Sequence, residues 1–492
     1  MFQYDFSNHQ NRHIRIMDMP AEYFQRIQET TRNDPYYPVW HIAPKCGLMN
    51  DPNGLCEING IHHIFYQWFP AGPVHGLKHW YHLTTKDFIH YEDFGPVVFP
   101  DEDIDAHGVY SGSAFIEDDT IHYFYTGNLK YFDRDDYDYI NSGRGSNTIT
   151  FTSKDGYEFT KKELLMTTDD YPADMSNHVR DPKIFKKNEK YYMVLGARDV
   201  EGVGMILLYE STDLKNWTYK NRITTPQKFG YMWECPDLFE MDGQLYIICC
   251  PQGVETQGID YENVHQVTAM KLDYDFDTDK YEITDIKLFD RGFDFYAPQS
   301  FEDESGRRIL IGWMGIPDAD YTNPTEEAGW QHALTIPREL SVRDGKLIQE
   351  PIEELKQLRS EDKAVCTFCY GQTIIMQNAI YEAVVDFKRC REMVMTLREG
   401  ITLSYKDNIL TLNLGVYGSG RSTRKVRLEK LEHLQIFADT SSLEIFVNHG
   451  EEVFTTRIYN HHGRLLINGE CSGIMTVYPL KSFEIEGGRH EE

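Results

Sequence analysis

One aspartate of this sequence is held in a restricted backbone position. Asp51 stands in Met49-Asn-Asp-Pro-Asn-Gly54, directly before a proline. Pro52 disfavours the helical region for the residue before it, and Asn53-Gly54 is a turn dipeptide, so we expect Asp51 in extended backbone at a strand end. A plain turn also explains this segment, because short motifs often match by chance. The choice between an acid presented at a strand end and a plain turn residue therefore depends on the other acids of the chain.

Two further acids stand in comparable surroundings. Asp181 precedes a proline in Arg180-Asp-Pro182, and Glu234 lies in Trp233-Glu-Cys-Pro-Asp237. Two carboxyl groups on facing walls of a pocket can cleave a glycosidic bond, since one protonates the leaving oxygen and the other attacks the anomeric carbon or activates water. A third acid can hold the sugar.

The local sequence suggests a role for each acid. The restrained Asp51 suits an ionised nucleophile. Apolar neighbours should raise the pKa of Glu234 toward that of a general acid, and Arg180 should keep Asp181 ionised. No histidine stands at ligand spacing near Asp181 or Glu234, so we expect no metal and no cofactor.

A repeat indicates how these acids could meet. Runs rich in Tyr, Phe, Ile and Val alternate with turn residues, as in all-β proteins. A hydroxyl residue, an Asp and an aromatic residue four positions after the Asp recur at 85–91, 153–159 and 211–217, with weaker echoes at Asp273 and Asp344. Five units of about 60 residues predict a five-bladed β-propeller. Asp51, Asp181 and Glu234 stand early in their units, where the first strand lies nearest the axis, so we expect them to face one channel.

Length and composition predict more than one domain. The chain has 492 residues, and all seven tryptophans precede residue 350. A helix is expected over 21–32, because Asn33-Asp-Pro35 stops it. We predict an N-terminal extension with this short helix (1–35), a catalytic propeller (36–348), a helical linker (349–364) and a β-sandwich domain (365–492).

Charge and cysteine content narrow the class of protein. A net charge of −29 argues against nucleic acid or an anionic membrane as a partner. The nine scattered cysteines fit reduced thiols better than a disulfide framework. The first residues show no basic segment followed by an apolar run, so we expect a cytoplasmic protein. The sequence leaves open whether it is a monomer or a homodimer.

Nine short motifs together carry a family resemblance. They are Met49–Gly54, Phe65–Gln67, Tyr110–Ala114, Tyr125–Gly127, Arg180–Pro182, Glu234–Asp237, Tyr296–Phe301, Gly312-Trp313 and Pro337–Leu340. In these motifs and their order the chain resembles glycoside hydrolase family 32, the β-fructosidases. The resemblance implies a five-bladed propeller with a C-terminal β-sandwich, and it implies Asp51 as nucleophile, Glu234 as acid/base and Asp181 as transition-state stabiliser. It also implies sugar contacts from Asn50, Gln67, Trp80, Ser111, Arg180 and Tyr296, with Trp313 close by.

The expected substrates are sucrose 6-phosphate, sucrose and short fructosides. The segment Gly72–Trp80 and the absence of a signal resemble the intracellular sucrose-6-phosphate hydrolases of this family. In so acidic a chain, His75, Lys78 and His79, with His82 nearby, form a basic cluster suited to a phosphate. A fructan hydrolase or fructosyltransferase remains an alternative. A non-catalytic sugar-binding propeller is a further alternative, from a different functional class.

Overall fold

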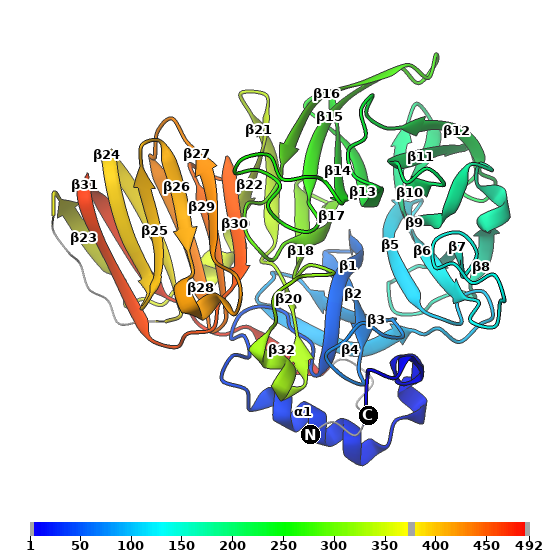
Figure 1. The fold of residues 1–492 in the computed structure, drawn as a ribbon, viewed down its shortest axis with the longest axis horizontal. Coiled ribbons are helices and arrows are strands. Elements are labelled where there is room, and N and C mark those ends of the chain that lie inside the picture. Colours follow the sequence, from blue (N-terminus) through cyan, green and yellow to red (C-terminus); the bar gives the residue numbers. More distant parts are fainter. Residues whose placement is uncertain (1–3, 372–378, 488–492) are drawn as a thin grey trace.

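The computed structural model describes residues 4–371 and 379–487. The chain begins with the short helices η1 (His9–His13) and η2 (Ile16–Asp18), followed by α1 (Ala21–Arg32). The predicted helix over 21–32 is therefore confirmed. Tyr23, Ile27 and Thr31 are four residues apart, so they share the buried face of α1. The Tyr23 hydroxyl donates to the carbonyl of Ala71 at 2.6 Å and fixes α1 below the first sheet (Figure 1).

Four antiparallel sheets follow, each built on four consecutive strands. The strands are β1 (Gly47–Ile58), β2 (Ile61–Phe69), β3 (His79–Thr85) and β4 (His90–Val98); β5 (Val109–Glu117), β6 (Thr120–Lys130), β7 (Arg144–Ser153) and β8 (Glu163–Met166); β9 (Met175–Lys187), β10 (Lys190–Asp199), β11 (Gly204–Ser211) and β12 (Thr218–Ile223); β13 (Met232–Met241), β14 (Gln244–Gln252), β15 (Thr268–Tyr274) and β16 (Tyr281–Leu288). The short helix η3 (Thr168–Asp170) follows β8. These sheets have the form of propeller blades.

The next sheet is irregular. It contains β17 (Tyr296–Glu302), β18 (Arg308–Met314), β20 (Ala333–Leu334), β21 (Arg338–Arg343) and β22 (Lys346–Pro351). After β18 the chain detours through η4 (Pro324–Ala328) and β19 (Trp330–Gln331), and β19 pairs with β1 of the first sheet. The structure therefore shows four regular blades, and the prediction of five equal units was wrong because this detour interrupts the last repeat.

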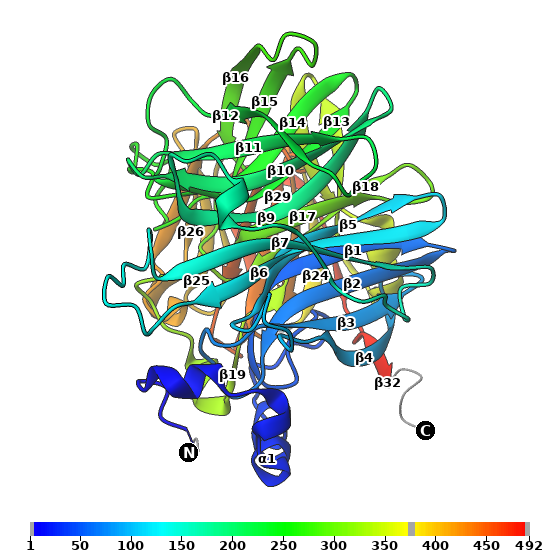
Figure 2. The same ribbon diagram turned by 90° about the vertical axis from the view of Figure 1, so that its right-hand side faces the viewer.

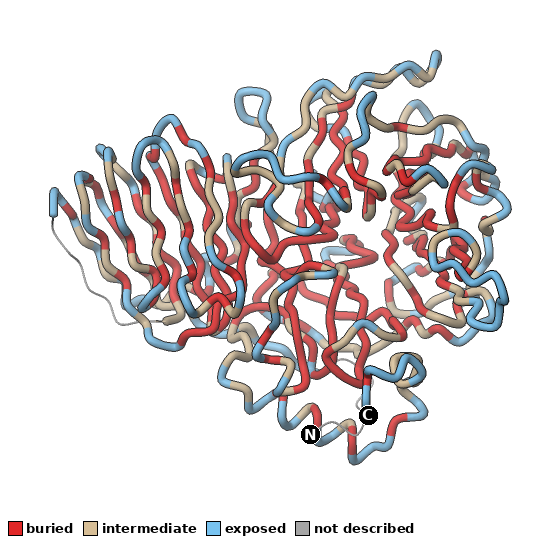
Figure 3. Tube along the Cα trace, viewed as in Figure 1, coloured by how far each residue is buried: buried red, intermediate tan, exposed pale blue. Residues whose placement is uncertain are grey.

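The first strands of the sheets lie together around one axis. β1 contacts β5, β5 contacts β9, β9 contacts β13, β13 contacts β17, and β17 returns to β1 (Figure 1). Figure 3 shows buried chain where these strands approach one another. Side chains on β1, β9 and β13 are thereby directed to a common centre, so the predicted all-β propeller arrangement is confirmed.

The sequence repeat is a turn that joins the third and fourth strands of a blade. The Thr85 hydroxyl accepts from the amide of Phe88 at 2.8 Å, and the Asp87 carboxylate accepts from that of Ile89 at 3.0 Å. Ser153 with Asp155, and Ser211 with Asp213, make the same bonds. In the fourth sheet the acceptor is Asp275 instead of the predicted Asp273, while Asp344 lies in the β21–β22 turn.

A second β-region follows η5 (Glu353–Leu358), a 3₁₀ segment within the predicted linker. Its strands are β23 (Ala364–Cys369), β24 (Tyr381–Arg398), β25 (Ile401–Lys406), β26 (Ile409–Asn413), β27 (Thr423–Arg427), β28 (His433–Asp439), β29 (Ser442–Val447), β30 (Glu452–Arg457) and β31 (Gly463–Pro479), with η6 (Gly415–Gly418) between β26 and β27. They form one nine-stranded, sandwich-like sheet with its own apolar core, as predicted. The last strand, β32 (Glu484–Gly487), pairs with β4 of the first blade (Figure 2).

No helix among residues 4–371 and 379–487 is long and apolar enough to cross a bilayer. All nine cysteines are unpaired, as expected for reduced thiols.

Candidate active site

A cavity of about 550 Å³ opens where the first strands converge. Asp51 from β1, Asp181 from β9 and Glu234 from β13 all line it. The three acids of the sequence prediction are therefore brought together in one cavity.

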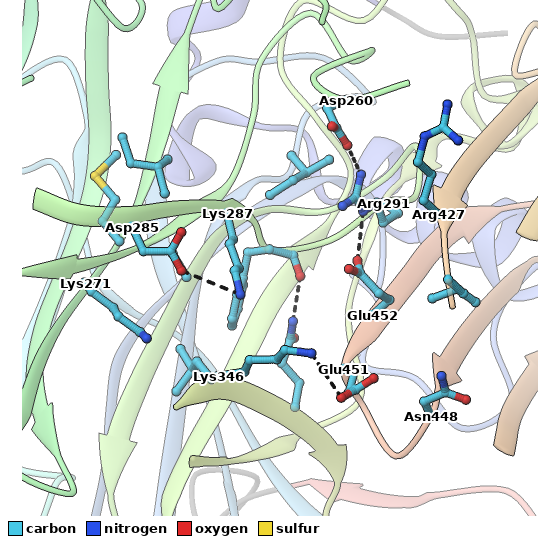
Figure 4. Close-up of a pocket in the computed structure, with 18 of the residues that line it drawn as sticks. Asp260, Lys271, Asp285, Lys287, Arg291, Lys346, Arg427, Asn448, Glu451 and Glu452 are labelled. Atoms are coloured by element: carbon cyan, nitrogen blue, oxygen red, sulfur yellow. Dashed lines mark hydrogen bonds and ion pairs between the residues drawn. The ribbon is translucent and has the colours of Figure 1, made fainter. Parts of the chain in front are cut away.

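A second cavity, of about 630 Å³, lies between the propeller and the C-terminal sheet (Figure 4). Its charged side chains are largely paired with one another. Arg291 binds Glu452 at 2.8 Å and also Asp260, and Lys346 binds Glu451 at 3.3 Å. None of Asp51, Asp181 and Glu234 lines this second cavity, so we place the candidate site in the first one.

A β-bulge in each first strand presents the acids. Two residues of the first strand face a single residue of its neighbour at 50–51, 110–111, 181–182, 235–236 and 297–298. Asp51 is the second residue of its bulge, Asp181 the first, and Glu234 immediately precedes its own. The predicted equivalence of the three acids was therefore only approximate. Bulges of this kind re-aim side chains beside active sites.

Asp181 has an unusual backbone conformation. Its φ is 66°, in the left-handed region, whereas its proline neighbour indicated an extended strand like that expected for Asp51. The Asp181 amide donates to the Thr126 hydroxyl at 2.8 Å, and the Cys235 amide donates to the Asp181 carboxylate at 3.0 Å. Such strain persists only where neighbours hold it, as these two bonds do.

Asp51 accepts hydrogen bonds from polar side chains of β1 and β5. Its carboxylate accepts from the Asn50 amide at 3.1 Å and from the Ser111 hydroxyl. Gln67 links these donors, because its carbonyl accepts from Asn50 at 2.7 Å and its amide donates to Ser111 at 2.6 Å. These contacts fix the orientation of the Asp51 carboxylate toward the cavity.

Glu234 has stronger partners. Arg180 donates to its Oε1 through Nη2 at 2.5 Å and through Nε at 3.1 Å. On Oε2, Tyr296 donates at 2.7 Å and Gln252 at 2.8 Å. Arg180 therefore forms its close ion pair with Glu234, whereas its Nε lies 3.9 Å from the carboxylate of Asp181.

These surroundings shift the pKa values of the three acids in directions that differ from those expected from the sequence. Burial raises the pKa of Asp51 against the hydrogen bonds from Ser111 and Asn50. Burial also raises the pKa of Asp181 to about 7, although the charge of Arg180 opposes it. Burial alone would raise the pKa of Glu234 too, but the charge of Arg180 and the hydrogen bond from Tyr296 outweigh it and the pKa is lowered. The expected raised pKa of Glu234 was wrong, because the side chain of Arg180 reaches across to it.

Most of the predicted sugar contacts line the cavity. These are Asn50, Gln67, Ser111, Arg180, Tyr296 and Trp313. Trp80 instead packs in an apolar cluster between the first two blades, and its indole donates to the carbonyl of Tyr110 at 3.0 Å. Trp80 therefore supports the wall that carries Tyr110 and does not face the cavity.

The predicted basic cluster is divided by the fold. His75 and Lys78 line the cavity, and the Lys78 ammonium donates to His75 Nδ1 at 3.2 Å. His79 lies behind it, 3.4 Å from the carbonyl of Trp68, and His82 stacks on Phe65 with ring centroids 4.1 Å apart. Burial lowers the pKa of His79 to about 4 and that of Lys78 to about 7. The four residues therefore do not form one patch beside the cavity, because β3 is buried along its whole length and holds His79 and His82 away from it.

Sequence reasoning missed several cavity residues. Gln252 binds Glu234, and Tyr110 carries the backbone beside Ser111. Arg12, Lys130 and Arg144 bring further positive charge, from η1, the end of β6 and the start of β7. Tyr110 begins one of the nine motifs, but the other four residues stand in none of them, so only the three-dimensional arrangement reveals those four.

The chain is similar to several known proteins. It is 35% identical to a sucrose-6-phosphate hydrolase of Staphylococcus xylosus, over 97% of this chain and 98% of that protein. The structure of a sucrose-6-phosphate hydrolase from Lactobacillus gasseri matches with a TM-score of 0.87 at 29% identity, covering 97% of this chain and 99% of that one. A Bombyx mori GH32 β-fructofuranosidase mutant in complex with sucrose matches with a TM-score of 0.78 at 27% identity, covering 95% and 100%.

Family models agree with these similarities. Residues 41–351 match the glycosyl hydrolases family 32 N-terminal domain, and residues 371–477 match the glycosyl hydrolases family 32 C-terminal domain. The two matches span the propeller sheets and most of the C-terminal sheet. The chain therefore belongs to glycosyl hydrolase family 32.

Proposed function

We propose that the protein hydrolyses β-D-fructofuranosides, with sucrose 6-phosphate and sucrose as substrates, and retains the anomeric configuration. The observation that carries the proposal is that Asp51 and Glu234 face one cavity from β1 and β13. The names of the relatives support the substrate class, since they are sucrose-6-phosphate hydrolases and a β-fructofuranosidase bound to sucrose.

In the first step, Asp51 attacks the anomeric carbon of the fructosyl group. The glycosidic bond breaks, and Glu234 gives its proton to the leaving oxygen. In the second step, Glu234 takes a proton from water, the water oxygen bonds to the anomeric carbon, and the bond to Asp51 breaks. Asp181 and Arg180 hold the sugar hydroxyls during both steps.

Glu234 has to carry a proton before the first step, although Arg180 lowers its pKa. Sugar hydroxyls that accept hydrogen bonds from Arg180 weaken its contact with Glu234 Oε1. The sugar also excludes water from the cavity, and both changes raise the pKa of Glu234. A proton held by Asp181, whose pKa burial raises to about 7, is then available to Glu234.

The domain boundaries remain part of the proposal. We divide the chain into an extension (1–35), the catalytic propeller (36–348), a linker (349–364) and the sandwich domain (365–492), and we assign the irregular sheet of β17–β22 as the unit that closes the propeller. Its contact with β1 supports this assignment. The cytoplasmic location and the oligomeric state stay predictions.

The test is a comparison of kcat/KM for sucrose 6-phosphate and sucrose, with chromatographic identification of fructose as the common product. Hydrolysis of both, with preference for the phosphorylated sugar, is expected. Failure to release fructose from either sugar would refute the proposed function.

A further inference from the structure

Lys130 stands at the end of β6, where the cavity meets a neighbouring hollow. It lines both spaces, together with His9 and His13 of η1. Its backbone amide donates to His107 Nδ1 at 3.2 Å, which fixes the turn of the chain after β6. The Lys130 side chain therefore stands at the junction between the catalytic cavity and the N-terminal segment.

The charges around Lys130 are positive. Its pKa is lowered by burial and by the charges of Arg144 and Arg12, while the hydroxyl of Tyr139 opposes the shift. Within residues 4–371 and 379–487, Arg12, Lys130 and Arg144 make no ion pair with a carboxylate. We call these three residues the basic group. Its lack of a carboxylate is unusual in a chain of net charge −29.

Arg144 shows the contrast with other buried arginines most clearly. It is 2% exposed, and its hydrogen-bond partners include no carboxylate: they are Asn128 Oδ1 at 2.9 Å, the Tyr139 hydroxyl at 3.3 Å and His178 Nδ1 at 3.3 Å. Its Nε is buried without a hydrogen-bond partner. The buried Arg338 and Arg421 bind carboxylates at 2.6 and 2.7 Å. Arg398 and Arg457 are buried without a carboxylate as well, but unlike Arg144 they do not line the cavity. Burying a guanidinium without a carboxylate costs folding free energy. An anion that binds here therefore forms the charge pair that Arg144 lacks in the structure.

Hydrogen bonds of its backbone and side chain hold Arg12 in place beside the cavity. Its backbone carbonyl accepts from the Leu77 amide at 2.7 Å, which ties η1 to the loop before β3. At Gly76 a Cβ atom would lie 2.7 Å from the same carbonyl, so only glycine allows this approach. Arg12 Nε donates to the carbonyl of Phe6 at 2.8 Å, which leaves its remaining N–H groups for the cavity.

Lys78 connects the basic group with the acids. Its charge interacts with both Asp51 and Lys130. Because Asp51 and the basic group line the same cavity, a substrate whose fructosyl group lies at Asp51 can place its leaving-group sugar against the basic group. A phosphate monoester carries up to two negative charges and accepts hydrogen bonds from guanidinium and ammonium groups.

We propose that Arg12, Lys130 and Arg144 form the subsite for the phosphate of a phosphorylated leaving-group sugar. The inference rests on the proposed function and deepens it. It replaces the sequence-based assignment of His75, Lys78 and His79. The N-terminal extension then contributes a specificity residue, Arg12, to a cavity built by the propeller.

The test uses the ratio of kcat/KM for sucrose 6-phosphate to kcat/KM for sucrose. In Lys130→Met this ratio should fall about 10- to 100-fold, because a charge-assisted contact is lost for one substrate only. Lys130→Arg should restore most of it. Lys161→Met, at an exposed lysine outside the cavity, is the matched control and should leave the ratio unchanged. Thermal unfolding of each variant checks folding.

A ratio that stays within about twofold of the parent in Lys130→Met, or that falls only in Lys78→Met, would overturn the subsite while leaving the proposed function intact. Inorganic phosphate provides a readout independent of catalysis. Its binding, measured by calorimetry, should weaken in Lys130→Met and not in Lys161→Met. If the parent protein hydrolysed neither sugar, the proposed function would fail, and Lys130-dependent phosphate binding would still support the subsite. Phosphate binding that ignores Lys130 would overturn it.

Discussion

Two of the buried groups of ionisable residues in this molecule differ in how their charges are balanced. The cavity cluster comprises Asp51, Asp181, Glu234 and Arg180, so three acids share one arginine. The interface cluster comprises His41, Arg338, Asp439 and Glu444, and it joins the propeller to the C-terminal sheet. There His41 binds Asp439 at 2.8 Å and Glu444 at 2.9 Å, and Arg338 binds Glu444 at 2.6 Å.

The pKa shifts follow this balance. In the interface cluster burial opposes the charged forms, but the partners outweigh it: the pKa of His41 is raised, and those of Asp439 and Glu444 are lowered. In the cavity cluster burial prevails for both aspartates. A perturbed pKa alone therefore does not identify a catalytic acid. What distinguishes the cavity cluster is its access to a cavity large enough for a sugar.

The largest expected effect is the loss of activity in Asp51→Asn. Removing the nucleophile should lower kcat for sucrose on the order of 10⁴-fold. The melting temperature should not fall, because the substitution removes one of the unbalanced charges. Steady-state kinetics and thermal unfolding measure both properties. A variant that retains a tenth of the parental kcat would remove Asp51 from the nucleophile role.

Glu234→Gln should reduce kcat for sucrose by about 10²- to 10⁴-fold, because the leaving oxygen no longer receives a proton. A fructoside with a strongly acidic leaving group needs little protonation and should lose much less. The two losses are compared under identical conditions. Equal losses on both substrates would contradict the acid role.

Glu444→Gln in the interface cluster should lower the stability of the protein and leave its activity nearly unchanged. It leaves Arg338 and His41 without their shared carboxylate, and breaking such a buried pair costs about 3–5 kcal/mol of stability. Denaturant unfolding should show this loss, while kcat/KM of the folded enzyme stays close to that of the parent. A large loss of kcat/KM at full folding would show that the C-terminal sheet takes part in the chemistry.

A smaller expected effect concerns how the stability of the folded protein depends on pH. Because the pKa of His41 is raised above its ordinary 6.5, its contribution to stability is complete below pH 6.5 and is lost as the pH rises through the raised value. The carboxylates of Asp439 and Glu444 act in the other direction: their contribution is present above their ordinary pKa values and is lost as the pH falls through the lowered ones. Melting temperatures recorded across pH should decline on the alkaline side in the parent, and less so in His41→Gln. An identical alkaline decline in both proteins would exclude His41 as its source.

Much of the fold could be predicted from local sequence. The helix at 21–32 and the turns after Thr85, Ser153 and Ser211 depend on neighbouring residues, and they form as expected. The interruption of the last repeat could not be predicted, because it depends on β19 pairing with β1 across almost 300 residues. Local patterns carry no information about such distant pairing.

The candidate site could likewise be predicted only in part from the sequence. The convergence of Asp51, Asp181 and Glu234 followed from their positions in the repeat. The charge states did not, because they depend on Arg180 reaching Glu234 and on the depth of burial. Lys78 and His79 are adjacent in sequence, yet Lys78 lies in the loop before β3 and lines the cavity, whereas His79 begins β3 and packs behind it.

The decisive measurement is the stereochemistry of transfer to methanol. If the cavity cluster works through a fructosyl–Asp51 intermediate, sucrose in aqueous methanol should yield methyl β-D-fructofuranoside, because two displacements at the anomeric carbon retain its configuration. This product does not mutarotate, so NMR reads its configuration directly. Methyl α-D-fructofuranoside would show a single displacement and would contradict Asp51 as the nucleophile.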